Sequence, residues 1–280
     1  MDHLGIARRG FGPDSLGLLD HQLAMCRRHG VAIETGREAD LAAIETAVAT
    51  YFAALFYEWT DGEDAFRREM EQARLGYVRS ADVRTSILDP GASDLFGLLN
   101  HNNYEKGGWV LHTLRGVVGD SAFHAGIRAY YAAHASGTAV TDDLRAAMER
   151  ASGRDLGWFF DQWLYKGGEP HYSVSWSKSA VQQGDNVVPS TRVDVDQIHQ
   201  MDQLTGVFRM PVVVEVWYKD HTNDRVRVDI ATKNVVVQVP NPGNKPVDFV
   251  LFDPGSYIMK KLTFDKSWDE RVSQLRYAPN

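Results

Sequence analysis

The sequence predicts an α+β protein in which a multi-helix region is followed by a small all-β region. From about residue 40 to residue 166, apolar residues recur at steps of three and four, the spacing of one face of an α-helix. After Pro170 the period changes to two, because Tyr172, Val174 and Trp176 alternate with polar residues. Six or seven such runs follow at intervals of roughly 8–12 residues, with turn-forming residues between them, and this pattern is typical of a β-sandwich.

The helical half is expected to contain helices near residues 44–59, 61–77, 104–118, 121–134, 141–152 and 155–165. Asp61 is expected to cap the helix near residues 61–77 at its N-terminus, and Thr141 the helix near 141–152. Gly119 is expected to end the helix near 104–118, and Gly153 the helix near 141–152. The expected buried face of the first helix consists of Val48, Tyr51, Phe52, Leu55 and Phe56.

The segment boundaries follow from these changes of pattern. Residues 1–44 are expected to be a divergent, helical N-terminal segment, and residues 45–168 the main helical region. Residues 169–264 are expected to form the β-sandwich, and residues 265–280 a C-terminal tail.

Composition excludes several classes of protein. The formal charge is −7 and the isoelectric point is near 5.8, so no basic patch for nucleic acid is expected. The single cysteine, Cys26, excludes an intramolecular disulfide. The longest nearly apolar run, residues 47–57, is shorter than the roughly 20 residues that cross a bilayer, so no membrane partner is expected. No signal peptide precedes the first helix, which predicts a cytoplasmic protein as written, or an exported one if the true N-terminus is missing.

The most informative block is residues 100–115, N-H-N-N-Y-E-K-G-G-W-V-L-H-T-L-R. Tyr104 opens the predicted helix, near its positive end, and a hydroxyl there can donate a hydrogen bond to a developing oxyanion. Two glycines, Gly107 and Gly108, allow another backbone to approach closely. From the residues alone, a tyrosine that only caps or packs the helix start stays open as the simpler interpretation.

Tyr104-Glu105-Lys106-Gly107 resembles the Y-x-K-G motif of the gluzincin aminopeptidases of the M1 family. Upstream, residues 49–52 (A-T-Y-F) are similar to the end of the family's G-F-A-T-Y-F. Downstream, the family's order continues in residues 119–123 (G-D-S-A-F), 141–144 (T-D-D-L), 152–156 (S-G-R-D-L), 159–164 (F-F-D-Q-W-L) and 168–170 (G-E-P).

The resemblance covers roughly residues 45–264 and implies the C-terminal, helical part of a thermolysin-like catalytic domain with the following β-sandwich. It also implies a zinc metallopeptidase that hydrolyses N-terminal peptide bonds. In that family the tyrosine of Y-x-K-G stabilises the tetrahedral intermediate, and this role transfers to Tyr104.

The sequence departs from the family where the metal should bind. Family members carry H-E-x-x-H and, 18 residues later, a glutamate, which together hold one zinc. No H-E-x-x-H occurs in the 280 residues, and the nearest string, residues 21–25 (H-Q-L-A-M), lacks the general base and the second histidine. The family's G-x-M-E-N motif is also absent. Thr46 stands at the position of the glutamate ligand, while Glu45 lies one residue, or about 100° of helix, away. Whether Glu45 can act as a metal ligand stays open.

Two explanations therefore remain: a degenerate homologue, or part of a longer enzyme whose N-terminal stretch here is truncated or frameshifted. In both cases we expect no zinc and no turnover from this chain alone, with peptide substrates bound only if the missing catalytic part is supplied. The alternative is a non-catalytic module, derived from the M1 fold, that binds a protein or peptide.

The remaining candidate residues carry weaker signals. Cys26 and His29 form a C-x-x-H pair that is more typical of inert side chains than of a metal site. His101 precedes Tyr104 by three residues, so a place in the same pocket stays open, although a solvated loop histidine is the simpler expectation. His112 and His124 lie in different predicted helices without ligand spacing, so structural roles are expected for both.

Overall fold

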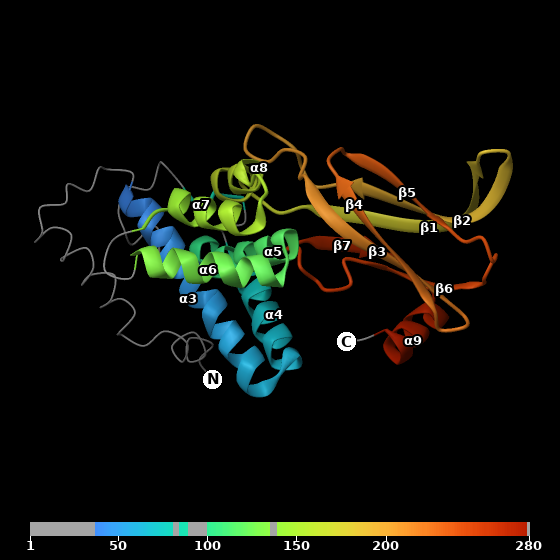
Figure 1. Ribbon diagram of the computed structural model, residues 1–280, viewed down its shortest axis with the longest axis horizontal. Helices are drawn as coiled ribbons and strands as arrows, with labels where there is room; N and C mark the ends of the chain where they lie inside the picture. The colour runs from blue at the N-terminus through green and yellow to red at the C-terminus, as the bar shows by residue number, and fades with distance from the viewer. Residues whose placement is uncertain (1–36, 81–83, 89–99, 135–138, 279–280) are drawn as a thin grey trace, which may run out of the picture. The chain divides into compact units, whose positions relative to one another are not determined.

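The computed structural model describes residues 37–80, 84–88, 100–134 and 139–278, with the side chains at 37–39, 41 and 42 excepted. It divides into two compact units that meet in sequence at Tyr165 and Lys166, and each is described by itself (Figure 1). Most of the N-terminal segment, including residues 21–25 and the Cys26–His29 pair, lies outside the described residues.

The first unit is helical, as the sequence predicts. Its long first helix, α3, begins before the predicted boundary at residue 44, and two short π-helical turns, η2 and η3, replace parts of predicted α-helices. The elements described in this unit are α3 (Arg37–Asp61), α4 (Glu63–Arg79), η2 (Asn102–Lys106), α5 (Gly107–Val118), α6 (Asp120–His134), α7 (Thr141–Ser152), α8 (Gly157–Phe160) and η3 (Asp161–Tyr165).

The predicted buried face of α3 is partly wrong. Tyr51 is fully buried, but Phe52 and Phe56 are 40% and 56% exposed. The buried stripe instead runs through small residues, Ala43, Ala47 and Ala54 among them. Small residues line this face because α5, whose first residues are glycines, approaches α3 closely. Only short side chains fit between two helix backbones that are this near. The large aromatic residues Phe52 and Phe56 are therefore a poor guide to which face of α3 is buried.

Both predicted N-caps lie one residue from the caps that the structure shows. Helix α3 continues to Asp61, and Gly62, with φ of 87°, makes the turn into α4 and caps it. Val140 is the N-cap of α7. Thr141 is the first residue of the helix, and its backbone N–H and hydroxyl both donate to the Asp40 carboxylate on α3. The predicted helix ends are confirmed: Gly119 and Gly153 end α5 and α7, and both have positive φ.

The second unit holds seven strands among its described residues, in two sheets. One sheet has the order β5-β2-β1-β7 and the other β4-β3-β6; the pairing is antiparallel except between β1 and β7. The strands are β1 (His171–Gln183), β2 (Asn186–Gln197), β3 (Met210–Tyr218), β4 (Asn223–Ile230), β5 (Asn234–Pro240), β6 (Val247–Phe252) and β7 (Lys261–Phe264).

The alternation of apolar and polar residues that predicts these strands also determines which of their side chains are buried. Val174 of β1 pairs with Val195 of β2, and both are buried. Tyr172 of β1 contacts Phe252 of β6, with ring centroids 5.1 Å apart, so the two sheets contribute to one core. The fold class is therefore confirmed as α+β.

The expected C-terminal tail contains a helix, α9 (Trp268–Tyr277). Ser267 caps it, and Glu270 completes a capping box by accepting a hydrogen bond from the Ser267 backbone N–H at 2.7 Å. The S-x-x-E pattern of residues 267–270 was the available sequence signal. Among the described helices, none is long and apolar enough to span a membrane.

Candidate active site around Tyr104

Tyr104 lies in the π-helical turn η2, which leads directly into α5. The wide turn is visible in the backbone hydrogen bonds: the N–H of Lys106 reaches back five residues to the carbonyl of His101, at 3.2 Å. Single π-helical turns occur frequently at functional sites, since they redirect a side chain that a regular helix would place elsewhere. Tyr104 itself is half-buried, so its ring is partly accessible.

The two glycines that follow Tyr104 fix this turn against α3. A Cβ atom added at Gly107 would lie 2.7 Å from Cβ of Ala47, a distance that no real contact tolerates. At Gly108 it would lie 3.0 Å from Cγ2 of Thr50. The glycines of the motif therefore allow α5 to approach α3 closely, at the height of Ala47.

The phenol of Tyr104 is kept in its protonated form by its surroundings. Burial, and then the neighbouring Glu105 carboxylate, raise the pKa of Tyr104 above its usual value. Burial also raises the pKa of Glu105, and the nearby His101 opposes that shift. The two side chains form a pair, with Nδ1 of His101 3.0 Å from Oε1 of Glu105. Tyr104 is thus a hydrogen-bond donor at neutral pH.

Several buried polar atoms in the same turn have no hydrogen-bond partner within the described part of the chain. They include Oδ1 of Asn102, Nδ2 of Asn103 and Oε2 of Glu105. Asn102 and Asn103 are at most 1% exposed. Most buried polar groups in proteins are satisfied, so such a concentration in one turn of five residues marks it as unusual.

The described residues do not fit a catalytic zinc site. Thr46 is buried and donates its hydroxyl to the carbonyl of Ala43, within its own helix. The Glu45 carboxyl is partly buried, which raises its pKa to about 7. Within the described ranges, no group of three His, Cys, Asp or Glu side chains is placed to hold a metal ion.

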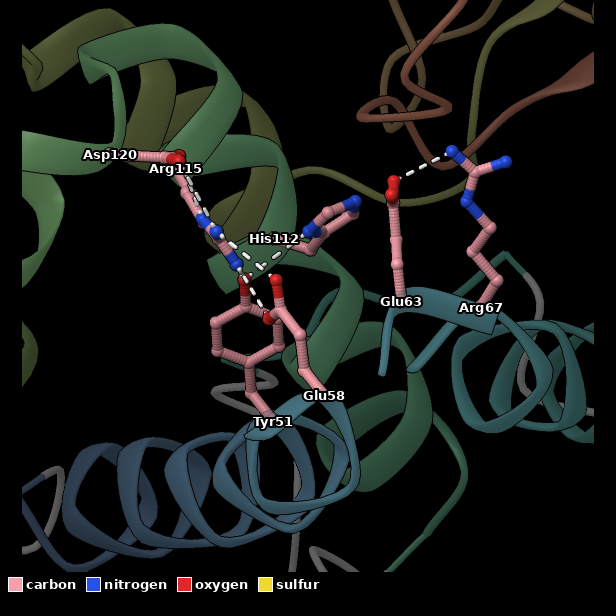
Figure 2. Close-up of polar contacts among 7 residues, drawn as sticks. All are labelled: Tyr51, Glu58, Glu63, Arg67, His112, Arg115 and Asp120. Carbon is pink, nitrogen blue, oxygen red and sulfur yellow. Dashed lines mark hydrogen bonds and ion pairs between the residues drawn. The ribbon is translucent and has the colours of Figure 1, made fainter. Parts of the chain in front are cut away.

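A second polar cluster lies further along α3 and α5 (Figure 2). The guanidinium of Arg115 donates to Glu58 of α3 at 3.1 Å, to Asp120 of α6 at 2.8 Å and to the hydroxyl of Tyr51 at 3.4 Å. The same hydroxyl lies 3.2 Å from Nδ1 of His112. We call Tyr51, Glu58, His112, Arg115 and Asp120 the Arg115 network.

Ionisation states in the Arg115 network follow from these contacts. Burial alone would lower the pKa of Arg115, but the hydrogen bonds to Asp120, Glu58 and Tyr51 outweigh it and raise the pKa. The same hydrogen bond lowers the pKa of Asp120, although burial opposes this shift. Burial raises the pKa of Tyr51 well above its usual range. Arg115 and Asp120 are thus held in their charged forms, and the hydrogen bonds of Arg115 join α3, α5 and α6.

The structure separates the predicted candidates. His101 joins Tyr104 in the turn through its pair with Glu105. His112 belongs to the Arg115 network and is surrounded by aromatic rings, among them those of Phe66 and Trp109. His124 contacts the ring of Phe123 on α6.

Sequence reasoning did not single out Asn102, Asn103 or the Arg115 network. The available signals were the asparagines directly before Tyr104, and an arginine within an apolar helix.

Comparisons with known proteins agree on one family. Residues 45–163 match the peptidase family M1 domain. Aminopeptidase N of Lactococcus lactis subsp. lactis is 42% identical over 71 residues, which are 25% of this chain and 8% of that protein. Aminopeptidase N of Haemophilus influenzae is 23% identical over 188 residues, 63% of this chain and 21% of that protein. The chain therefore spans about a fifth or less of these relatives.

The fold is also similar to that of a solved structure, Legionella pneumophila aminopeptidase A in complex with aspartic acid. The TM-score is 0.65 at 12% identity, over 86% of this chain and 26% of that chain. The Y-x-K-G turn at Tyr104 and the segment of α3 that it contacts both lie inside the matched range. Residues 45–163 of this chain thus match the peptidase family M1 domain, and the chain is similar to M1 aminopeptidases.

Proposed function

We propose that this chain is part of an M1-type aminopeptidase site, in which it supplies the hydrogen-bond donor for the transition state of peptide hydrolysis. Tyr104 is that donor. The observation that carries the proposal is the geometry of η2, which presents a half-buried, protonated phenol at the start of α5, inside the family's sequence motif.

The chemistry that Tyr104 performs is electrostatic. When a peptide carbonyl is attacked, negative charge develops on its oxygen, and a fixed donor stabilises this charge more than it stabilises the planar substrate. The phenol O–H is suited to this role because its proton is retained at neutral pH. Loss of one such donor typically reduces turnover by about 10²–10³-fold.

The chain alone is proposed to be inactive. Its sequence contains no H-E-x-x-H, and its described side chains do not fit a catalytic zinc. Zinc and the general base would have to come from a further polypeptide segment, and peptide substrates would bind only in that complete site.

An aminoacyl-anilide assay tests the proposal. The 280-residue chain should show no turnover above the blank, with or without added zinc. When a polypeptide carrying the H-E-x-x-H part of an M1 relative is added, turnover should appear and should fall by about 10²–10³-fold with Tyr104→Phe. Saturable, chelator-sensitive turnover by the chain alone would contradict the proposed inactivity. Equal complemented turnover with Tyr104 and with Tyr104→Phe would contradict the role of the phenol.

A non-catalytic binding module is the second candidate, favoured by one observation. Three aromatic side chains on the second half of α3, Phe52, Phe56 and Trp59, are 40%, 56% and 82% exposed. Exposed apolar patches on proteins often mark interaction sites. If Tyr104→Phe has no effect in the complemented assay while Phe56→Ser and Trp59→Ser abolish association with a captured partner, the binding module is the better account.

A further inference from the structure

The side chain of Asn102 connects the Tyr104 turn to a segment far from it in sequence. Asn102 is fully buried. Its amide Nδ2 lies 3.0 Å from the carbonyl oxygen of Thr85, 2.9 Å from the hydroxyl of Thr85 and 2.7 Å from the carbonyl oxygen of Ser86. The two amide protons therefore serve three acceptors, two of which are backbone carbonyls.

The same turn is held at its beginning by Asn100. The side-chain oxygen of Asn100 accepts the backbone N–H of Asn102 at 2.9 Å and that of Asn103 at 3.1 Å. The N–H of Asn102 thereby gains a partner, and the N–H of Asn103, which also donates to the backbone carbonyl of Asn100 at 3.1 Å, gains a second one. Asn100 therefore supports the turn from within, whereas Asn102 ties it to a different part of the chain.

We propose that Asn102 is a positioning residue for Tyr104, and that its side-chain amide fixes the direction of the phenol by anchoring η2 to Thr85 and Ser86. The proposal rests on the function proposed for Tyr104. The amide nitrogen of Asn102 donates to both carbonyls, and among the residues that the structure describes Oδ1 of Asn102 has no hydrogen-bond partner. The contribution of the side chain is thus entirely that of a donor.

The anchor acts on the part of the turn that the glycines do not hold. Gly107 and Gly108 fix the C-terminal side of the turn against α3. Tyr104 lies between these glycines and Asn102, two residues from the amide anchor. Without the Asn102 side chain, the turn would lose its hydrogen bonds to Thr85 and Ser86, and the N-terminal side of the turn, which carries Tyr104, would be free to shift against that segment.

The experiment reads the position of Tyr104 directly. The full chain is prepared with 3-fluorotyrosine at position 104 only, and its ¹⁹F resonance is recorded with Asn102, with Asn102→Ala and with Asn102→Asp, which keeps the size but removes the donor. Asn241→Ala is the matched control. Asn241 is also a buried asparagine that closes a loop, with Nδ2 2.8 Å from the carbonyl oxygen of Lys245, but it lies in the other unit.

Both substitutions at position 102 are expected to move the resonance toward its unfolded position or to split it, while Asn241→Ala leaves it in place. An unchanged resonance in a folded Asn102 variant would overturn the proposal. If neither variant at position 102 folds, Thr85→Val decides, because it removes one of the three acceptors: a shifted resonance supports the proposal, and an unshifted one contradicts it. The resonance does not depend on turnover, so failure of the anchor and failure of the catalytic role of Tyr104 are distinguishable.

Discussion

The two ends of the α3–α5 helix pair treat buried polar groups in opposite ways. At the end marked by Glu58 and Arg115, the charged side chains are joined in the Arg115 network. At the end marked by Ala47 and Gly107, three buried polar atoms of the Tyr104 turn have no partner among the residues that the structure describes. The same two helices thus form one end that is fully connected and one that is not.

This difference indicates that the Arg115 end of the helix pair contributes to the stability of the fold, whereas the Tyr104 end costs stability. An unsatisfied buried polar atom costs free energy of folding, so a turn that contains several is typical of a site shaped for something other than stability. The Arg115 network stabilises the packing of α3, α5 and α6, and the turn at the other end of the helix pair presents Tyr104. The following predictions test this division.

Arg115→Ala is expected to have the largest effect, because it leaves the partly buried Glu58 carboxylate and the buried hydroxyl of Tyr51 without their donor. We expect a loss of about 3 kcal/mol in the free energy of unfolding, measured by urea denaturation. Arg67→Ala is the control. Arg67 pairs with Glu63 at 2.6 Å, but both side chains are exposed, so it should change stability by less than about 1 kcal/mol (Figure 2). Equal effects would show that the network contributes no more than a surface ion pair.

Gly107→Ala is expected to cost about 2 kcal/mol, because the added Cβ would overlap Ala47 and separate the two helices. The change in thermal unfolding checks this prediction. At Gly206 an added Cβ would meet no atom within 4 Å, so Gly206→Ala should be close to neutral. If Gly107→Ala is as stable as the unchanged chain, the close approach of α5 to α3 is not required.

Glu45→Gln is expected to change the pH dependence of stability. The pKa of Glu45 is raised from 4.5 to about 7 in the folded chain, so the folded state binds this proton more tightly than the unfolded state. Stability is therefore fully present below pH 4.5 and declines as the pH rises to about 7.

Relative to the unchanged chain, Glu45→Gln should be more stable at pH 8 by about 1 kcal/mol, with a flatter profile between pH 4.5 and 7. Asp40, Asp143 and Tyr130 lie near this site, and the same series should be measured with Glu69→Gln, which removes an exposed carboxylate of α4. Parallel profiles for both variants would show that Glu45 does not titrate in this range.

The order of the elements could be predicted from the sequence because period and turn residues are local signals. Gly119 and Gly153 end their helices as expected, since positive φ favours glycine. The inner face of α3 could not be predicted in full, because its closest approach to α5 is made by Ala47 and Thr50, which carry no strong apolar signal.

The motif predicts a role for Tyr104, whereas no motif predicts one for Asn102. The acceptors of the Asn102 amide lie 16 and 17 residues away, and only the folded chain brings them to it. A π-helical turn likewise has no sequence signature of its own, so neither the turn nor its anchor could be read from the local pattern.

The metal content of the chain tests the central claim most directly. The claim is that this chain contributes the Tyr104 turn of an M1 site without the residues that hold the metal. After incubation with excess zinc and dialysis, elemental analysis should find far less than one zinc per chain. One tightly bound zinc per chain, lost together with aminoacyl-anilide turnover on treatment with a chelator, would contradict it.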